Sequence, residues 1–296
     1  MRTIPLACLL LLLFLPVTGE AQQQYIYLVK AARCTSAPAE RALTGFRVHG
    51  VRGIITALHG VADSQTITVM GLKGQPGNSL VTIYEVDVAH DLARLSSPEF
   101  ERMRAEGLEI AAGMDWKART SVRVIGYPLN IDLEALTLPL TIGEPPIKVL
   151  GHLVNDRTRS LLQARNSPSP GIAVLYLVGP LHPGHSGAPI LDRNNRVIGV
   201  GDGGLQQFSE IGWAIPFQGL TWTPFSRNSL PESLKRSASA GLFSYDTDPQ
   251  SAEERIRAMV AAIKEDTGAI RQDTARCVKS ALERLNGSSR RDRSHF

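Results

Sequence analysis

The segment HPGHSGAPILD, residues 182–192, has the composition of a reactive turn. It places Ser186 between Gly184 and Gly187, directly before an apolar run. Glycine permits tight turns and close backbone approach because it has no Cβ. A serine in such a turn can expose its hydroxyl beside backbone N–H groups, as a nucleophile next to an oxyanion site requires. The turn therefore indicates acyl-transfer chemistry.

A serine hydroxyl is a weak nucleophile until a base removes its proton, and a third group must orient that base. The sequence offers both groups at the ends of strand-like runs. His59 follows an apolar run in GIITALHGVAD, and Asp91 precedes one in VDVAHDLARL. Taken singly, each residue is more often an ordinary surface or turn residue than a catalytic one. Together with Ser186 they predict a His–Asp–Ser triad.

Other chemistries find little support in the composition. His182 and His185 are the histidine pair with ligand-like spacing, and they lie inside the serine turn, so we expect no metal and no cofactor. The net charge is +4, from 32 basic and 28 acidic residues. No basic stripe with interleaved aromatic residues accompanies this small excess, so we expect no binding to nucleic acid.

The candidate residues lie among short strand-like runs between Leu43 and about Phe217. Gly, Pro, Asn and Asp separate runs that are rich in Val, Ile, Leu and Thr. Closely spaced turn signals of this kind favour an all-β barrel or sandwich. The charged segment 97–113 predicts one short helix. The runs are FRVHG, GIITAL, QTITVMG, SLVTIYEV, SVRVIGYPL, IKVLGHLV, AVLYLVG, RVIGVGDGG and EIGWAIP.

The beginning of the chain has the pattern of a secretory signal peptide. Arg2 precedes the apolar run IPLACLLLLLFLPV, residues 4–17. This run is shorter than the roughly 20 residues that a membrane-spanning helix needs. Small residues near Ala21 favour cleavage after it, so we expect residues 1–21 to be a signal peptide. The mature chain should carry no membrane span and should be periplasmic or extracellular.

The end of the chain has a different composition. Residues 226–250 are rich in Ser, Pro and small side chains, which predicts a linker or a surface wrap. Residues 251–296 begin with capping-box spacing and continue with apolar positions at steps of four and three, which predicts a helical extension with a basic tail. This helix could pack on the preceding domain, bind a partner or mediate self-association. Export would leave Cys34 and Cys277, which could pair with each other, stay as thiols or bridge two chains.

The ordered set of motifs resembles the trypsin-like (chymotrypsin-fold) serine endopeptidases, especially the compact bacterial branch that includes HtrA-type proteases. The resemblance covers about residues 43–217. TGFRV looks like the first barrel strand, TALHGV like the histidine motif, HDLARL like the aspartate motif and RVIGYPL like the strand that opens the second barrel. PGHSGAPILD resembles the serine motif, RVIGVGDGG the strand after it and GWAIP the pocket strand. Nothing after these motifs resembles a PDZ domain.

This resemblance implies an all-β fold of two six-stranded antiparallel β-barrels within residues 22–225, followed by the C-terminal α-helical extension. It also implies roles for the candidate residues. Ser186 would attack a peptide carbonyl, and His59 would accept its proton while Asp91 orients the imidazole. The backbone N–H groups of Gly184 and Ser186 would form the oxyanion hole.

Departures from the family pattern bear on the site. His185 stands where the family usually has Asn or Asp, and it should point away from the nucleophile. Ala188 replaces a glycine, and the site should tolerate its methyl group. Asp87 is a rival for Asp91, but the Leu-Ala-x-Leu after Asp91 favours the latter and leaves His90 as a bystander.

Substrate preference follows from the implied pocket. Cleavage after Lys or Arg relies on an acidic residue six positions before the serine, where this chain has Pro180, and residues 175–184 include no acid. With Trp213 and Ala214 on the pocket strand, we expect a small-to-medium apolar or uncharged residue before the cut.

The expected function is therefore that of a secreted serine endopeptidase that cleaves protein or peptide substrates through an acyl-enzyme. The alternative is a catalytically silent module that keeps a protease fold to bind peptides or partners. An esterase shares the chemistry, but the α/β-hydrolase elbow requires the order Ser, acid, His, and here the serine comes last.

Overall fold

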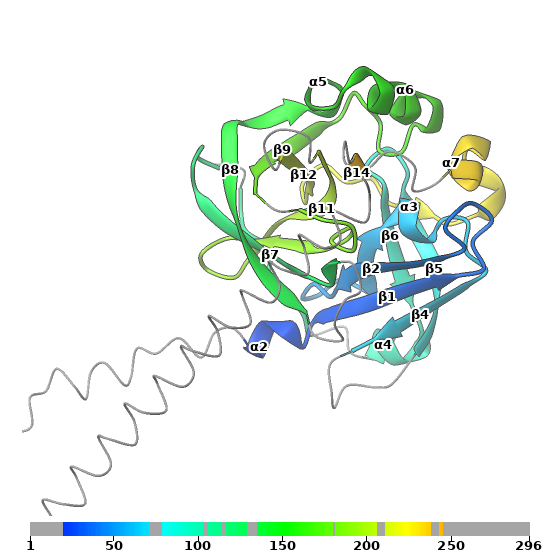
Figure 1. Ribbon diagram of the computed structural model, residues 1–296. Helices are drawn as coiled ribbons and strands as arrows, with labels where there is room; N and C mark the ends of the chain where they lie inside the picture. The colour runs from blue at the N-terminus through cyan, green and yellow to red at the C-terminus, as the bar shows by residue number, and fades with distance from the viewer. Residues whose placement is uncertain are drawn as a thin grey trace, which may run out of the picture. The chain divides into compact units, whose positions relative to one another are not determined.

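A computed structural model (Figure 1) describes residues 20–71, 79–102, 106–113, 116–128, 135–179, 181–205, 211–237 and 243–244. All of these belong to the first of the two units into which the chain divides, Met1–Asp246. The expected signal peptide, Pro180, Cys277 and the expected helical extension 251–296 lie outside or almost wholly outside the described residues. Within the described ranges, no helix is long and apolar enough to cross a membrane.

The first half of the described chain forms a closed antiparallel barrel, drawn in blue and cyan in Figure 1. The order around it is β5-β4-β1-β2-β3-β6, and pairing of β5 with β6 closes the circle. A short strand, β13 (Thr223–Pro224), adds to the outside of β5. The six barrel strands are β1 (Ile26–Ala32), β2 (Glu40–Phe46), β3 (Ile54–Ala57), β4 (Thr66–Met70), β5 (Ser79–Asp87) and β6 (Leu92–Ser96).

The second half forms another closed antiparallel barrel, drawn in green in Figure 1. Its order is β10-β7-β8-β9-β12-β11, closed by pairing of β10 with β11, and β14 (Phe243–Ser244) lies parallel to β11. The predicted fold of two six-stranded antiparallel barrels is thus confirmed. The strands are β7 (Ser121–Gly126), β8 (Leu136–Val149), β9 (Ala173–Val178), β10 (Pro189–Leu191), β11 (Val197–Leu205) and β12 (Ile211–Pro216).

Strand β1 shows how the two barrels share apolar surface. Side chains alternate between the faces of a strand. Tyr27 and Val29 therefore fill the first barrel, whereas Ile26 and Leu28 join a cluster that includes Trp213 of the second barrel. Because both faces of β1 are buried, its sequence is a nearly continuous apolar run.

Helices are short and lie in the connections. Predicted segment 97–113 contains one of them, α4, as expected. In the segment predicted as linker or surface wrap, Leu230 and Leu234 are buried in the first barrel's core cluster, so its described part wraps that barrel. The helices are α2 (Glu20–Gln23), α3 (Leu58–Val61), α4 (Pro98–Arg102), α5 (Leu150–Leu153), α6 (Asp156–Arg165), the 3-10 turn η2 (Arg227–Ser229) and α7 (Glu232–Ser237).

Two local predictions differ from the structure, and one helix was not predicted. The TGFRV segment ends the second barrel strand, because β1 precedes it. The run IKVLGHLV is a strand only to Val149, and α5 then begins at Leu150. Helix α6 was not predicted; Asn155 caps its start by accepting a bond from the Thr158 N–H, and Asn166 ends it at a φ of 53°.

Candidate active site

His59 lies in α3, a single helical turn that follows β3 directly. Three backbone contacts hold this turn. The Leu58 N–H donates to the Asp91 carbonyl at 2.7 Å, and the His59 N–H donates to Asp91 Oδ1 at 3.0 Å. Arg41 Nη1 donates to the His59 carbonyl at 3.2 Å. The imidazole position is therefore fixed by its own backbone as well as by its ring contacts.

Asp91 ends the loop between β5 and β6 and is fully buried. Its φ is 57°, in the left-handed region that few residues other than glycine adopt. Its Oδ2 lies 2.5 Å from His59 Nδ1, and its Oδ1 accepts a bond from Ser167 Oγ at 2.8 Å. The carboxyl group thus faces the imidazole with both oxygens engaged.

Ser186 lies in the turn before β10, between two glycines with positive φ, 94° at Gly184 and 81° at Gly187. A Cβ at Gly187 would lie 2.2 Å from the carbonyl oxygen of Thr44, so only glycine fits there. Ser186 Oγ lies 2.9 Å from His59 Nε2. The structure therefore brings together the three residues that the sequence predicted as a triad.

Thr44 on β2 of the first barrel holds the serine turn of the second. Its N–H donates to the Ser186 carbonyl at 3.0 Å, and its Oγ1 donates to the Gly184 carbonyl at 2.7 Å. The same Oγ1 accepts a bond from the Tyr127 N–H at 3.0 Å. Because the Gly184 carbonyl is held toward Thr44, the following peptide groups are held in a defined orientation.

The backbone around Ser186 leaves two N–H groups available. Gly187 N–H donates to the Gly201 carbonyl and Ala188 N–H to the His185 carbonyl. Across the described part of the chain, the N–H groups of Gly184 and Ser186 donate to no protein acceptor. Their role as an oxyanion hole stays a prediction.

Burial governs the ionisation of this site. Burial lowers the pKa of His59, so the imidazole is neutral at neutral pH and can accept a proton. Burial raises the pKa of Asp91 to about 6, against the opposing charge of Arg165 and the hydrogen bond from Ser167. At neutral pH the site therefore holds a neutral base next to a carboxylate.

Sequence reasoning missed the residues that surround the Asp91 carboxyl group. Arg165 is the last residue of α6 and Ser167 follows the helix, and both are buried. Asp202 on β11 is also fully buried, and its Oδ1 lies 3.8 Å from His59 Nδ1. A charged residue in the middle of the strand-like run RVIGVGDGG was the available signal for Asp202.

The rival residues lie elsewhere. Asp87 Oδ2 lies 2.9 Å from His90 Nδ1 and accepts a bond from the Thr221 N–H at 2.6 Å. It is therefore Asp91 that meets His59. In the serine turn, His185 is fully buried, and its Nδ1 accepts a bond from the His182 N–H at 3.0 Å.

The expected pocket and disulfide residues are only partly described. Trp213 and Ala214 are fully buried, and Trp213 Nε1 donates to Asp202 at 2.9 Å, so the indole holds the Asp202 carboxyl group. Pro180 and Cys277 lie outside the described residues, and Cys34 is half-buried. The roles of these residues in a pocket or disulfide stay predictions.

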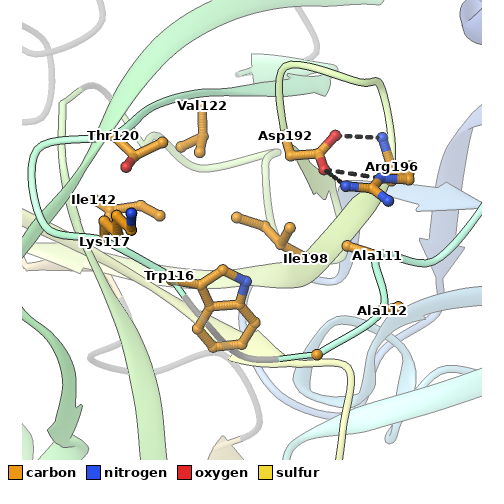
Figure 2. Close-up of a pocket in the computed structure, with 11 residues that line it drawn as sticks. Ala111, Ala112, Trp116, Lys117, Thr120, Val122, Ile142, Asp192, Arg196 and Ile198 are labelled. Carbon is orange, nitrogen blue, oxygen red and sulfur yellow. Dashed lines mark hydrogen bonds and ion pairs between the residues drawn. The ribbon is translucent and has the colours of Figure 1, made fainter.

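A pocket of about 300 Å³ lies between residues of the second barrel and the segment that precedes β7 (Figure 2). Trp116 and Lys117 lie on one side, and the Asp192–Arg196 ion pair on the other. The triad candidates do not line it, so it is separate from the candidate active site.

Two of three comparisons with known proteins find similar proteins. A family model described as a trypsin-like peptidase domain matches residues 43–200. The active form of the Rv3671c protease from M. tuberculosis is similar in structure, with a TM-score of 0.54, 23% sequence identity and coverage of 70% of this chain and 86% of that chain. The HtrA-type protease AlgW with a tripeptide is similar with a TM-score of 0.50, 14% identity and coverage of 67% of this chain and 57% of that chain. A comparison with curated proteins found no match.

Proposed function

The chain belongs to the trypsin-like peptidase family and is a serine endopeptidase, and from this premise we propose that it works through a His59–Asp91–Ser186 triad. One observation carries the proposal: His59 Nε2 lies 2.9 Å from Ser186 Oγ while His59 Nδ1 lies 2.5 Å from Asp91 Oδ2. These distances suit proton transfer along one line from the hydroxyl to the imidazole.

In the proposed mechanism Ser186 Oγ attacks the peptide carbonyl, and His59 Nε2 takes the hydroxyl proton. His59 then gives this proton to the leaving amine, and an acyl-enzyme remains on Ser186. Water, activated by the same imidazole, hydrolyses the ester. Asp91 keeps the Nδ1–H tautomer in place and stabilises the imidazolium. The N–H groups of Gly184 and Ser186 would bind the oxyanion, and loss of one such donor typically costs about 2.7–4 kcal/mol of transition-state stabilisation.

The proposed cleavage preference, for small or uncharged residues, is supported by Leu181. This side chain is buried beside β11 and beside β12, the expected pocket strand. A Cβ at Gly212 would lie 3.0 Å from Leu181 Cβ, and a Cβ at Gly201 would lie 3.5 Å from Leu181 Cδ1. The leucine therefore occupies space between glycines where a large substrate side chain would otherwise enter.

Shortening Leu181 should widen the preference. We expect Leu181→Ala to raise kcat/KM for peptides with larger apolar residues before the cut, by about 10-fold, because each methylene in such a pocket is worth about 1–3 kcal/mol. Cleavage profiling on a peptide library measures this. Val178→Ala, on the exposed side of β9, is the matched control and should leave the profile unchanged. Strict cleavage after Arg by the wild type would contradict the proposed preference.

Export is a further part of the proposal, supported by the apolar run 4–17 and the small residues before Gln22. Cleavage after Ala21 would make Gln22 the new N-terminus; its Oε1 accepts a bond from Arg123 at 3.1 Å. Mass spectrometry of the protein from a bacterial expression host should find a periplasmic or secreted chain that begins at Gln22. A full-length chain confined to the cytoplasm would contradict this part.

The triad itself is tested by active-site labelling. A fluorophosphonate probe should label the wild type, and Ser186→Ala should abolish labelling because the nucleophile is gone. Asp91→Asn should lower kcat by about 10⁴-fold, since the imidazole would adopt the wrong tautomer. Folded wild type that the probe does not label would instead favour a silent, peptide-binding protease fold.

A further inference from the structure

A second carboxyl group, that of Asp202, lies beside the proposed triad. It is fully buried on β11. Its Oδ1 lies 3.8 Å from His59 Nδ1. One ring nitrogen of His59 and one carboxyl oxygen each of Asp91 and Asp202 lie within 4.8 Å of one another. The triad mechanism assigns this group no role, although its burial has to be accounted for.

The charges in this buried region limit how many of the carboxyl groups can ionise. Arg165 is buried and interacts electrostatically with both Asp91 and Asp202. Two carboxylates this close repel each other, and an unbalanced charge in the protein interior is costly. One proton shared by the pair removes this repulsion and leaves one carboxylate charge near the positive charge of Arg165.

The surrounding hydrogen-bond donors decide which carboxyl group holds the proton. Asp91 receives three bonds: from the His59 N–H, from His59 Nδ1 and from Ser167 Oγ. Asp202 Oδ2 receives one, from Trp213 Nε1, and Oδ1 accepts none from the residues described. The carboxylate with more donors is the one that stays ionised. In agreement, burial and the Asp91 charge raise the pKa of Asp202 well above its usual value.

We propose that Asp202 is a positioning residue that stays protonated at neutral pH and donates its proton, as a hydrogen bond, to Asp91. The bond fixes the Asp91 carboxylate opposite His59 and removes the repulsion between the two carboxyl groups. The titratable or charged groups that interact with Asp202 are His59 on α3, Asp91 after β5 and Arg165 at the end of α6. The positioning role rests on the proposed triad, whereas the protonation of Asp202 does not depend on catalysis.

Infrared spectroscopy of the mature protein tests the protonation directly. The spectrum of the wild type minus that of Asp202→Asn, at neutral pH, should contain the C=O band of a buried carboxylic acid. Asp87→Asn is the matched control: Asp87 is also buried, but its hydrogen bonds to His90 and Thr221 outweigh burial and lower its pKa, so no such band should be lost. A wild type without the band, or a band that survives in Asp202→Asn, would overturn the proposal.

Kinetics test the positioning role. Asparagine can donate to Asp91 and accept from Trp213, so Asp202→Asn should retain most of kcat. Asp202→Ala should lose about 10- to 100-fold in kcat with little change in KM, because a buried acceptor loses its donor. The bond from Asp202 lowers the pKa of Asp91, so its loss should raise that pKa. The acid limb of the pH profile of kcat should therefore move to higher pH in the alanine variant.

Several outcomes would count against the role. Equal losses in the asparagine and alanine variants, or inactivation of the wild type by EDTA, would overturn it; the latter would point to a cation held by the same side chains. If circular dichroism shows that Asp202→Ala does not fold, Asp202→Val, which fills more of the space without a donor, replaces it. Wild type that is folded but unlabelled by fluorophosphonate would contradict the proposed function, and the infrared result would still decide the protonation.

Discussion

Asp91 adopts a backbone conformation that is costly for a residue with a side chain. A left-handed φ in a non-glycine residue costs of the order of 1–3 kcal/mol and persists only where the surroundings determine it. Here the surroundings are the Leu58 N–H, which bonds the Asp91 carbonyl, and the three donors on its carboxyl group. The strain is therefore offset by the same bonds that aim the carboxylate at His59.

The ionisation of Asp91 should set the acid limit of activity. Its pKa is raised to about 6 by burial, so as the pH falls through this value the carboxylate takes a proton and His59 loses its charged partner. We expect kcat to be high above this pH and to fall below it. A pH profile of kcat from about pH 5 to about pH 8 measures this fall in activity. A kcat that stays constant through the acid range would contradict the prediction.

At the scale of single residues the sequence could predict the three candidate triad residues but not their supports. His59, Asp91 and Ser186 each follow or precede a strand in a recognisable local pattern. Ser167 has no such pattern, and Asp202 shows only a charge within a strand-like run, because both approach Asp91 only after the barrels close and α6 packs.

The β3–α3 unit is anchored from a neighbouring strand. Arg41 on β2 forms a buried ion pair with Asp63, at 2.6 Å, just after α3. The same guanidinium donates to the His59 carbonyl. Helix α3 is too short to be stable by itself, so its position depends on these contacts of Arg41, which we call the Arg41 tie.

Breaking the tie should destabilise the protein in a pH-dependent way. Burial alone would raise the pKa of Asp63, but bonds from Arg41 and Ser36 outweigh it and lower that pKa. The stabilisation is therefore present above the unfolded pKa and is lost as the pH falls through the folded value. Asp63→Asn should cost about 3–5 kcal/mol at neutral pH, because Arg41 stays buried without its partner.

Urea unfolding at neutral and acidic pH measures both effects. The difference in the free energy of unfolding between wild type and Asp63→Asn should be smaller at acidic pH than at neutral pH. Arg119→Ala is the control, because the Arg119–Glu144 pair is largely exposed and its loss should leave stability within error. Equal stability of wild type and Asp63→Asn at neutral pH would show that the tie does not hold α3.

At the scale of elements, strands were easier to predict than α6. Alternating and buried runs identify β3, β4, β5, β7, β9, β11 and β12. Helix α6 is mostly polar, so it shows no apolar stripe, and its ends are instead defined by Asn155 and Asn166. Those caps were the signal that could have located it.

The whole site depends on contact between the two barrels. His59 and Asp91 belong to the first barrel and Ser186 to the second, and Thr44 bonds the serine turn across the junction. Gly187 allows this approach because a Cβ there would collide with Thr44 and Thr56.

Gly187→Ala should therefore separate Ser186 from His59. We expect loss of nearly all activity and a large loss of stability, because backbone atoms would have to move. Gly219→Ala is the matched control: Gly219 has a similar φ, 79°, but a Cβ there would meet nothing within 4 Å. Fluorophosphonate labelling and thermal unfolding distinguish the two variants. Gly187→Ala that behaves like Gly219→Ala would contradict the importance of this contact.

The division of the proposed triad between the two barrels has a consequence for incomplete chains and fragments. A ribosome that has translated as far as β6 has made His59 and Asp91 but not Ser186. A fragment that carries the serine turn has the reverse deficiency. Neither piece holds a complete triad, so under the proposed mechanism neither could cleave the proteins around it.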